Sequence, residues 1–133
     1  MDRLLSGKRA LVVEDEMLIL MMIEDMLRDL GCESVKAAAT VSQALALLET
    51  QNFDVATLDM NLEGNDSYLV AEALRTRGVP FVFATGYGSP KIRDGFSDRP
   101  VLKKPFMDRE LGEALARILA PQTEVNSGRI IGV

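Results

Sequence analysis

The chain has 133 residues and a net charge of −5, with 20 Asp and Glu residues against 15 Lys and Arg residues. This length suits one compact domain, and a hydrophobic fraction of 47% is too high for a disordered chain. The chain has no histidine and one cysteine, Cys32, which excludes a histidine-dependent nucleophile, a histidine-ligated zinc site, phosphohistidine on this chain and an internal disulfide. The acidic balance argues against nucleic acid as a partner. The remaining chemistry belongs to carboxylates, hydroxyls, lysines and a hard metal ion.

The N-terminal region does not predict export or membrane insertion. It carries basic residues but lacks the apolar core and small-residue cleavage site of a signal peptide. The longest apolar run, Met17–Ile23, is far shorter than the roughly 20 residues that a spanning helix needs. We therefore expect a cytoplasmic protein that does not bind membranes, with one domain at residues 1–120 and a C-terminal tail at residues 121–133.

Short apolar runs alternate with stretches of helical spacing along the chain. Strands are predicted at residues 10–13, 34–38, 53–58, 79–85 and 101–103. Helices are predicted between them, at residues 14–30, 41–48, 70–77 and 109–119. Thr40 and Gln43 form a candidate capping box, and Asp108 is the candidate cap of the last helix.

The segment between the fourth and fifth predicted strands has a different composition. Residues 86–99 include three glycines and a proline, with Ile92 and Phe96 as widely spaced apolar anchors. We expect at most a short helix in this segment, because glycine and proline both disfavour helix interiors.

Strands that alternate with helices predict an α/β fold with a doubly wound parallel sheet, covered by helices on both faces. In such sheets, ligands bind beyond the carboxyl ends of the strands, near the point where the strand order reverses. The candidate site therefore consists of the residues at these ends, which are Glu14, Asp15, Asp59, Thr85 and Lys104.

Three acids in this group favour a divalent cation. Carboxylates gathered at one edge of a sheet repel one another, and burial raises the pKa of at least one of them. Oxygen ligands without imidazole or thiolate favour Mg²⁺ or a similar hard ion, which commonly bridges carboxylates and phosphate oxygens. Glu14, Asp15 and Asp59 are thus candidate metal ligands for phosphoryl chemistry.

The other residues at the strand ends fit the same chemistry. Asp59 can act as a nucleophile, because carboxylates form acyl phosphates. Lys104 can supply a cation and Thr85 a hydrogen-bond donor to the transferred group. Lys104 precedes Pro105, and an X-Pro bond permits the cis geometry that could turn the lysine inward. Neighbouring strand residues face opposite sides, so only one of Lys103 and Lys104 is expected to reach the site.

Four short motifs carry a family resemblance: residues 12–16 (VVEDE), 58–62 (LDMNL), 83–86 (FATG) and 104–106 (KPF). Together, over residues 7–120, they resemble the CheY-like receiver domain of two-component response regulators. The resemblance implies a flavodoxin-like (βα)5 fold with strand order 2-1-3-4-5. It also implies phosphorylation of Asp59, with Mg²⁺ or Mn²⁺, by a sensor histidine kinase or a histidine phosphotransfer protein. Asp15 and Asp59 would ligate the metal directly, Glu14 through water and Asn61 through its backbone carbonyl.

The sequence also departs from the common receiver pattern. Val101 stands where many receivers carry an aromatic switch residue, and Glu63 stands where a proline is usual. Tyr87 follows Thr85 by two residues, and the run 83–87 (FATGY) is similar to the "FAT GUY" subgroup of receivers. That subgroup is often stand-alone, has a poorly formed fourth helix and is paired with HWE or HisKA_2 kinases. Asn61 and Tyr87 flank the site and are expected to tune autodephosphorylation.

The expected function is that of a single-domain receiver that signals through contacts with a downstream protein target. Such a domain is not an enzyme in the usual sense, because it catalyses only its own phosphotransfer and dephosphorylation. One alternative is a pseudo-receiver that binds partners without phosphorylation. Another is a phosphatase of the haloacid-dehalogenase type, which needs a second acid two residues after the nucleophile, where Asn61 stands here.

Four methionines lie at helical spacing in the first predicted helix: Met17, Met21, Met22 and Met26. Methionine is flexible and polarizable, and it is common both in cores and at adaptable binding surfaces. We expect these side chains to pack in the core, with kinase docking as the alternative.

Overall fold

The computed structural model describes residues 4–62, 66–86 and 92–120. Five parallel strands form one sheet in the order β2-β1-β3-β4-β5. The strands are β1 (Arg9–Val13), β2 (Ser34–Ala38), β3 (Val55–Asp59), β4 (Phe81–Thr85) and β5 (Val101–Lys103). The predicted sheet and its strand order are therefore confirmed.

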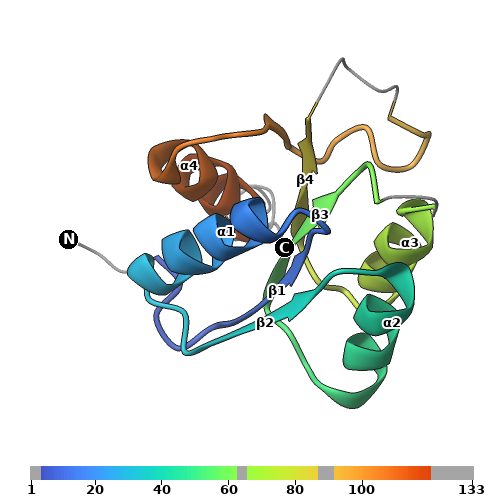
Figure 1. Ribbon diagram of the computed structural model, residues 1–133, viewed down its shortest axis with the longest axis horizontal. Helices are drawn as coiled ribbons and strands as arrows, with labels where there is room; N and C mark the ends of the chain where they lie inside the picture. The colour runs from blue at the N-terminus through green and yellow to red at the C-terminus, as the bar shows by residue number, and fades with distance from the viewer. Residues whose placement is uncertain (1–3, 63–65, 87–91, 121–133) are drawn as a thin grey trace, which may run out of the picture.

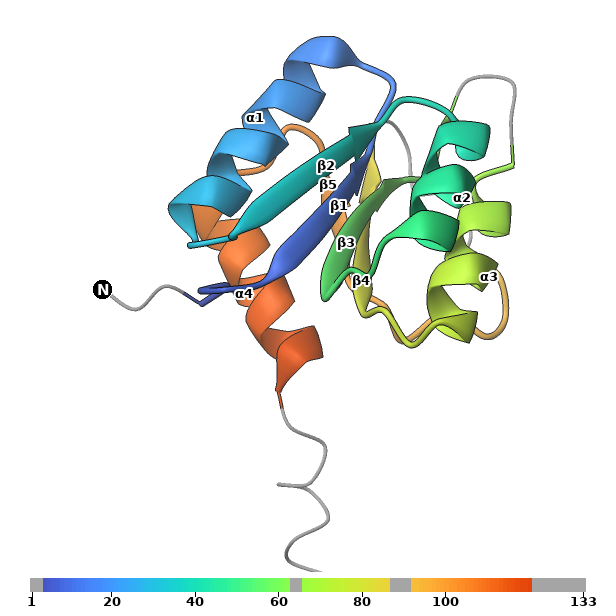
Figure 2. The same cartoon turned by 90° about the horizontal axis from the view of Figure 1, so that it is seen from below.

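Two pairs of helices cover the sheet, one pair on each face (Figures 1 and 2). One pair consists of α1 (Met17–Asp29) and α4 (Asp108–Leu119). The other consists of α2 (Val41–Thr50) and α3 (Tyr68–Thr76). Each pair packs on the sheet through its own apolar core, so the sheet separates two cores.

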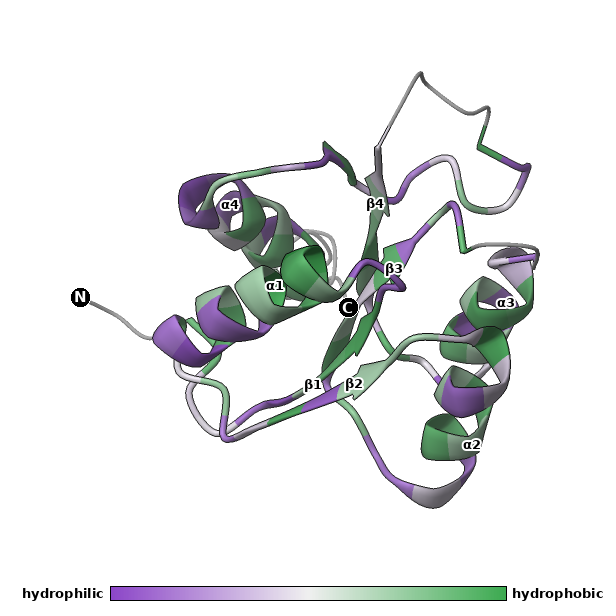
Figure 3. Ribbon diagram, in the orientation of Figure 1, coloured by the Kyte–Doolittle hydropathy of each residue, from purple (hydrophilic) through white to green (hydrophobic). Residues whose placement is uncertain are grey.

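The central strands supply side chains to both cores. In β1, Leu11 and Val13 pack with α2 and α3, whereas Ala10 and Val12 pack with α1 and α4. All four are buried because successive side chains of a strand point to opposite faces. This explains why β1, β3 and β4 have almost uninterrupted apolar sequences, which Figure 3 shows as apolar colour over the middle of the sheet.

Two strands begin later than predicted. The apolar runs start at Phe53 and Val79, but the strands start at Val55 and Phe81. Phe53 and Val79 are nevertheless buried against the core from the loops that lead into these strands. Burial thus extends beyond the hydrogen-bonded ladder, and apolar character alone does not mark where the ladder begins.

The helix caps differ in detail from the predicted ones. Thr40 Oγ1 accepts a hydrogen bond from Gln43 N at 3.1 Å, as predicted, but Gln43 Oε1 accepts from Ala39 N at 2.8 Å instead of from Thr40 N. The predicted cap at Asp108 is wrong. Met107 is the N-cap residue of α4, and its backbone N–H donates to Oε1 of Glu110 at 2.8 Å. The carboxylate three positions into the helix thus satisfies the cap without a capping side chain.

The described part of the connection between β4 and β5 contains no helix, since residues 92–99 form turns and bends. Both predicted anchors pack on the core: Phe96 is buried and Ile92 is half-buried. The Phe96 ring meets the rings of Tyr68, Phe81 and Phe83 at centroid distances of 5.5, 6.2 and 6.3 Å. Aromatic packing therefore holds this segment in place without helical hydrogen bonds.

The methionine prediction is wrong for two of the four residues. Met17 and Met21 are 64% and 51% exposed, whereas Met26 packs partly against the core. The buried face of α1 is formed by Leu20, Ile23 and Leu27. None of the helices in the described ranges is long and apolar enough to cross a membrane.

Candidate functional site

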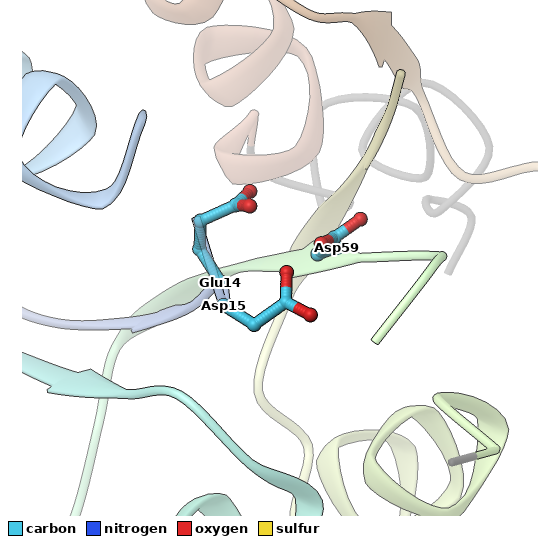
Figure 4. A group of neighbouring side chains, drawn as sticks. All are labelled: Glu14, Asp15 and Asp59. Atoms are coloured by element: carbon cyan, nitrogen blue, oxygen red, sulfur yellow. The ribbon is translucent and has the colours of Figure 1, made fainter. Parts of the chain in front are cut away.

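Three carboxylates meet where β1 and β3 end (Figure 4). Val13, the last residue of β1, pairs with Leu58 of β3, so Glu14 and Asp15 follow one strand beside Asp59 at the end of the other. One oxygen from each of the three carboxylates lies within 4.8 Å of the other two. The sheet register alone therefore brings together acids that are more than 40 positions apart in the chain.

Backbone amides orient two of these carboxylates. Glu14 and Asp59 are 1% and 2% exposed. Asp59 Oδ1 accepts a hydrogen bond from Asn61 N at 2.9 Å, and Glu14 Oε2 accepts one from Glu16 N at 3.1 Å. Each carboxylate is thus fixed by the turn that follows its own strand.

The pKa values reflect the crowding of charge. Burial, together with the charge of Asp59, raises the pKa of Glu14 to about 7. Burial also raises the pKa of Asp59, although the amide of Asn61 and the charge of Lys104 oppose this shift. Such a group of oxygen ligands, short of positive charge, fits a hard divalent cation. Among the described residues, Glu14, Asp15 and Asp59 form a group that can hold one.

Lys104 lies beside the acids from the end of β5. Its Nζ lies 3.0 Å from Oε2 of Glu14, 3.0 Å from Oε1 of Glu16 and 3.4 Å from Oδ2 of Asp59. Burial alone would lower its pKa, but the hydrogen bonds to Glu16 and Glu14 and the charge of Asp59 outweigh burial and raise it. The Lys104–Pro105 peptide bond is cis. Lys104 is buried and Lys103 is exposed, so the lysine expected to face the acids does so.

Thr85 ends β4, next to β3 in the sheet. Thr85 is buried, and its hydroxyl has no hydrogen-bond partner among the residues that the structure describes. Its backbone carbonyl accepts a hydrogen bond from Lys104 N at 2.7 Å, which ties the ends of β4 and β5 together. The Thr85 hydroxyl is therefore an unused buried donor at the same edge of the sheet.

A cleft of about 600 Å³ opens over these strand ends. Its walls include four of the predicted site residues, together with Gly86, but not Glu14, Thr85 or Val101. The lining residues are Asp15, Glu16, Ile19, Asp59, Asn61, Gly86, Lys103, Lys104 and Pro105. The cleft thus connects solvent with Asp15, Asp59 and Lys104.

The remaining predicted residues are not part of the buried group of charges. Asn61 is exposed and lines the cleft beside Asp59. Val101 is 41% exposed on β5 and pairs with Phe83 of β4. Tyr87 and Glu63 lie outside the described residues, as does the predicted tail.

One residue in contact with the lysine was not predicted. Glu16 was assigned only to the start of the first helix, yet its carboxylate hydrogen-bonds Lys104 Nζ, a residue 88 positions later. Its place next to Glu14 and Asp15 was the only signal in the sequence, and that signal equally favours a helix N-terminus.

The family model of the response regulator receiver domain matches residues 10–116. The chain belongs to this family. A receiver domain is a signalling domain of two-component systems, so the predicted family and fold are both confirmed.

Solved structures agree with this assignment. The receiver is similar to SdrG from Sphingomonas melonis, at 45% identity and a TM-score of 0.76, over 90% of this chain and all of SdrG. A BeF3-activated conformation of SdrG is 46% identical, with a TM-score of 0.73, over 86% of this chain and 98% of that one. The receiver domain of the sensor histidine kinase PA1611 from Pseudomonas aeruginosa is 28% identical, with a TM-score of 0.70, over 87% of this chain and all of that one. That structure has a magnesium ion coordinated in its active-site cleft.

Curated relatives are longer proteins. The receiver is 32% identical to a probable transcriptional regulator, ycf27, of Cyanophora paradoxa, over 90% of this chain and 51% of that protein. It is 27% identical to the transcriptional regulatory protein PdtaR of Mycobacterium tuberculosis, over 90% of this chain and 60% of that protein. The chain thus spans about half to three-fifths of the length of these relatives.

Proposed function

We propose that this receiver accepts a phosphoryl group on Asp59 from a phosphohistidine of a partner protein, in a Mg²⁺-dependent reaction in the cytoplasm. The observation that carries the proposal is the group of charged side chains at the ends of β1, β3 and β5. One oxygen of Asp59 lies within 4.8 Å of oxygens of Glu14 and Asp15, and Oδ2 of Asp59 lies 3.4 Å from Lys104 Nζ. A nucleophilic carboxylate beside one cation and a candidate metal site is the arrangement that phosphoryl transfer requires.

The proposed step forms one bond and breaks one. A carboxylate oxygen of Asp59 attacks phosphorus, and a P–O bond forms as the P–N bond to the donor imidazole breaks. The electron pair of that bond leaves on the imidazole nitrogen, which takes up a proton. Glu14, Asp15, Asp59 and the carbonyl of Asn61 are proposed to hold Mg²⁺, which neutralises charge on the phosphoryl oxygens when bound. Mn²⁺ can take the same place, because it also prefers oxygen ligands.

Two residues of this chain are proposed to stabilise the product. The Lys104 ammonium would pair with one phosphoryl oxygen, and the Thr85 hydroxyl would donate to another. The buried Thr85 hydroxyl, which has no partner among the described residues, supports this role, because a buried donor without a partner is costly unless a ligand uses it. Asn61 lines the cleft and is proposed, with Tyr87, to set the rate of dephosphorylation.

The proposed partners are proteins on both sides of the reaction. Upstream is a sensor histidine kinase or a histidine phosphotransfer protein, since the chain has no histidine of its own. Downstream is a protein target, and we propose no enzymatic activity beyond the chain's own phosphotransfer and dephosphorylation. The acidic net charge supports protein contacts over nucleic acid.

The upstream kinase is further proposed to be of the HWE or HisKA_2 type. Residues 83–87 (FATGY) and the absence of a helix within residues 92–99 support membership of the FAT GUY subgroup. Transfer profiling against purified kinases of both types and of the ordinary HisKA type tests the idea. Faster transfer from ordinary HisKA kinases would contradict it.

Labelling by a small phosphodonor tests the phosphoacceptor directly. The receiver is incubated with acetyl phosphate and Mg²⁺ and run on a phosphate-affinity gel. We expect a shifted band in the wild type and in the control Asp25→Asn, whose exposed side chain lies on α1. Asp59→Asn should give no shifted band. A band that persists in Asp59→Asn would exclude Asp59 as the acceptor, and steady phosphate release from added phosphoesters would favour the phosphatase alternative.

A further inference from the structure

The hydrogen bonds of Lys104 use its whole donor capacity before any phosphoryl group arrives. Its Nζ donates to the two oxygens of Glu14 at 3.2 and 3.0 Å and to Oε1 of Glu16 at 3.0 Å. A lysine ammonium has three N–H donors. Asp59 Oδ2, at 3.4 Å, is the more distant partner. Lys104 must therefore give up one of these three hydrogen bonds before it can donate to a group carried on Asp59.

The two glutamates differ in what their release would cost. The Glu14 side chain is 1% exposed and also accepts from Glu16 N, so in the metal-free receiver the loss of Lys104 would leave it a buried carboxylate without a cation. The Glu16 side chain is 64% exposed and can exchange the lysine for water at low cost. Glu16 is therefore the glutamate that Lys104 can release completely at the lower cost.

The position of Glu16 in its helix supports a specific contact with Lys104. Glu16 is the N-cap residue of α1, a position where the shorter side chains of Ser, Thr, Asp and Asn commonly accept a hydrogen bond from the first turn. Its side chain makes no such capping bond. Instead it lies on the wall of the cleft and hydrogen-bonds the lysine of a distant strand.

We propose that Glu16 is a positioning residue that holds Lys104 in the unphosphorylated receiver and must release it before the lysine contacts a phosphoryl group on Asp59. This inference rests on the proposed function, because it concerns the rate of that reaction. Glu16 acts as a brake on phosphorylation through Lys104. Its own carboxylate takes no part in the chemistry.

The test compares initial rates of labelling by acetyl phosphate at saturating Mg²⁺. We expect Glu16→Ala to be labelled about two- to fivefold faster than the wild type, which is the range of one solvent-accessible ion pair. Glu16→Gln keeps one acceptor oxygen and nearly the same size, so its rate should lie between the two. The control Glu24→Ala, on the same helix but outside the cleft, should match the wild type.

Two further measurements separate this role from others. Phosphoramidate carries less negative charge than acetyl phosphate, so a brake acting through Lys104 predicts the same gain with both donors. A gain seen only with acetyl phosphate would mean simple repulsion of the donor and would overturn the inference. Mg²⁺ affinity should stay within twofold of the wild type in Glu16→Gln, and a larger loss would instead make Glu16 a metal-site residue.

Different results would contradict the role of Glu16 and the proposed function. Equal labelling rates in wild type, Glu16→Gln and Glu16→Ala would contradict the inference alone. A wild-type receiver that neither donor labels would contradict the proposed function and the inference with it. Thermal melting of each variant confirms that the compared proteins are folded.

Discussion

Lys104 neutralises a group of carboxylates that is otherwise buried without a cation. Lys104→Ala is expected to lower the free energy of unfolding by about 3 kcal/mol, because breaking a buried ion pair leaves an uncompensated charge. Adding Glu14→Gln should restore a large part of this loss, since the buried group is then neutral. Urea denaturation measures both effects, with the exposed Lys103→Ala as control. A double variant no more stable than Lys104→Ala would place the loss in packing instead.

Cys32 offers a residue-scale test of burial. Burial, with the charge of Asp54, raises the pKa of the Cys32 thiol to about 11. Since the thiolate is the nucleophile, alkylation by iodoacetamide should accelerate about tenfold per pH unit from pH 8 to 10 without levelling off. In denaturant, the same curve should level off above about pH 8.5, the pKa of an ordinary thiol. A plateau near pH 8.5 in the folded protein would show that the thiol is not shielded.

At the scale of elements, the segment that joins β4 to β5 depends on one aromatic anchor. Phe96 contacts three other rings, and the Arg75 guanidinium lies 4.6 Å from its centroid. Phe96→Ala is expected to cost about 3 to 5 kcal/mol of unfolding free energy, through lost burial and a cavity. The matched control Leu69→Ala removes a side chain from a 55% exposed residue of α3 and should cost less than about 0.5 kcal/mol. Similar losses in both variants, measured by urea denaturation, would contradict an anchoring role.

At the scale of the whole molecule, the acidic edge of the sheet links cation binding to stability. Mg²⁺ at about ten times its dissociation constant should stabilise the fold by about 1.4 kcal/mol and raise Tm by a few degrees. Asp15→Asn should lose this response and Asp25→Asn should keep it, because only Asp15 belongs to the acidic group. Thermal melting with Mg²⁺ and then with excess EDTA measures the shift. An equal Tm rise in Asp15→Asn would mean that the cation binds elsewhere.

The architecture could be predicted from the sequence because it follows from local patterns. The apolar runs of the buried strands, and the glycine and proline content of the segment after Thr85, were both visible in the chain. The acids at strand ends were found because a parallel sheet gathers its carboxyl ends at one edge. The family resemblance then supplied the strand order that the residues alone leave open.

The parts that could not be predicted depend on individual side-chain contacts that no local sequence pattern specifies. The pairing of Glu16 with Lys104 joins residues 88 positions apart, and no local pattern specifies it. The cap at Met107 was missed because methionine is not a residue that marks helix N-caps, and the group that accepts from the Met107 backbone N–H is the carboxylate of Glu110. Met17 is exposed although it belongs to the same apolar run as the core residues Leu20 and Ile23, so composition could not separate them.

The order in which the site residues occur along the chain has a consequence during synthesis. Glu14 and Asp59, at the ends of β1 and β3, are synthesised before Lys104, the cation after β5 with which they pair. A ribosome must translate all five strands of this sheet before that lysine exists. A nascent or truncated receiver therefore carries Asp59 without its partner cation. The proposed phosphorylation would become possible only after β5 has joined the edge of the sheet, so unfinished chains could not be phosphorylated.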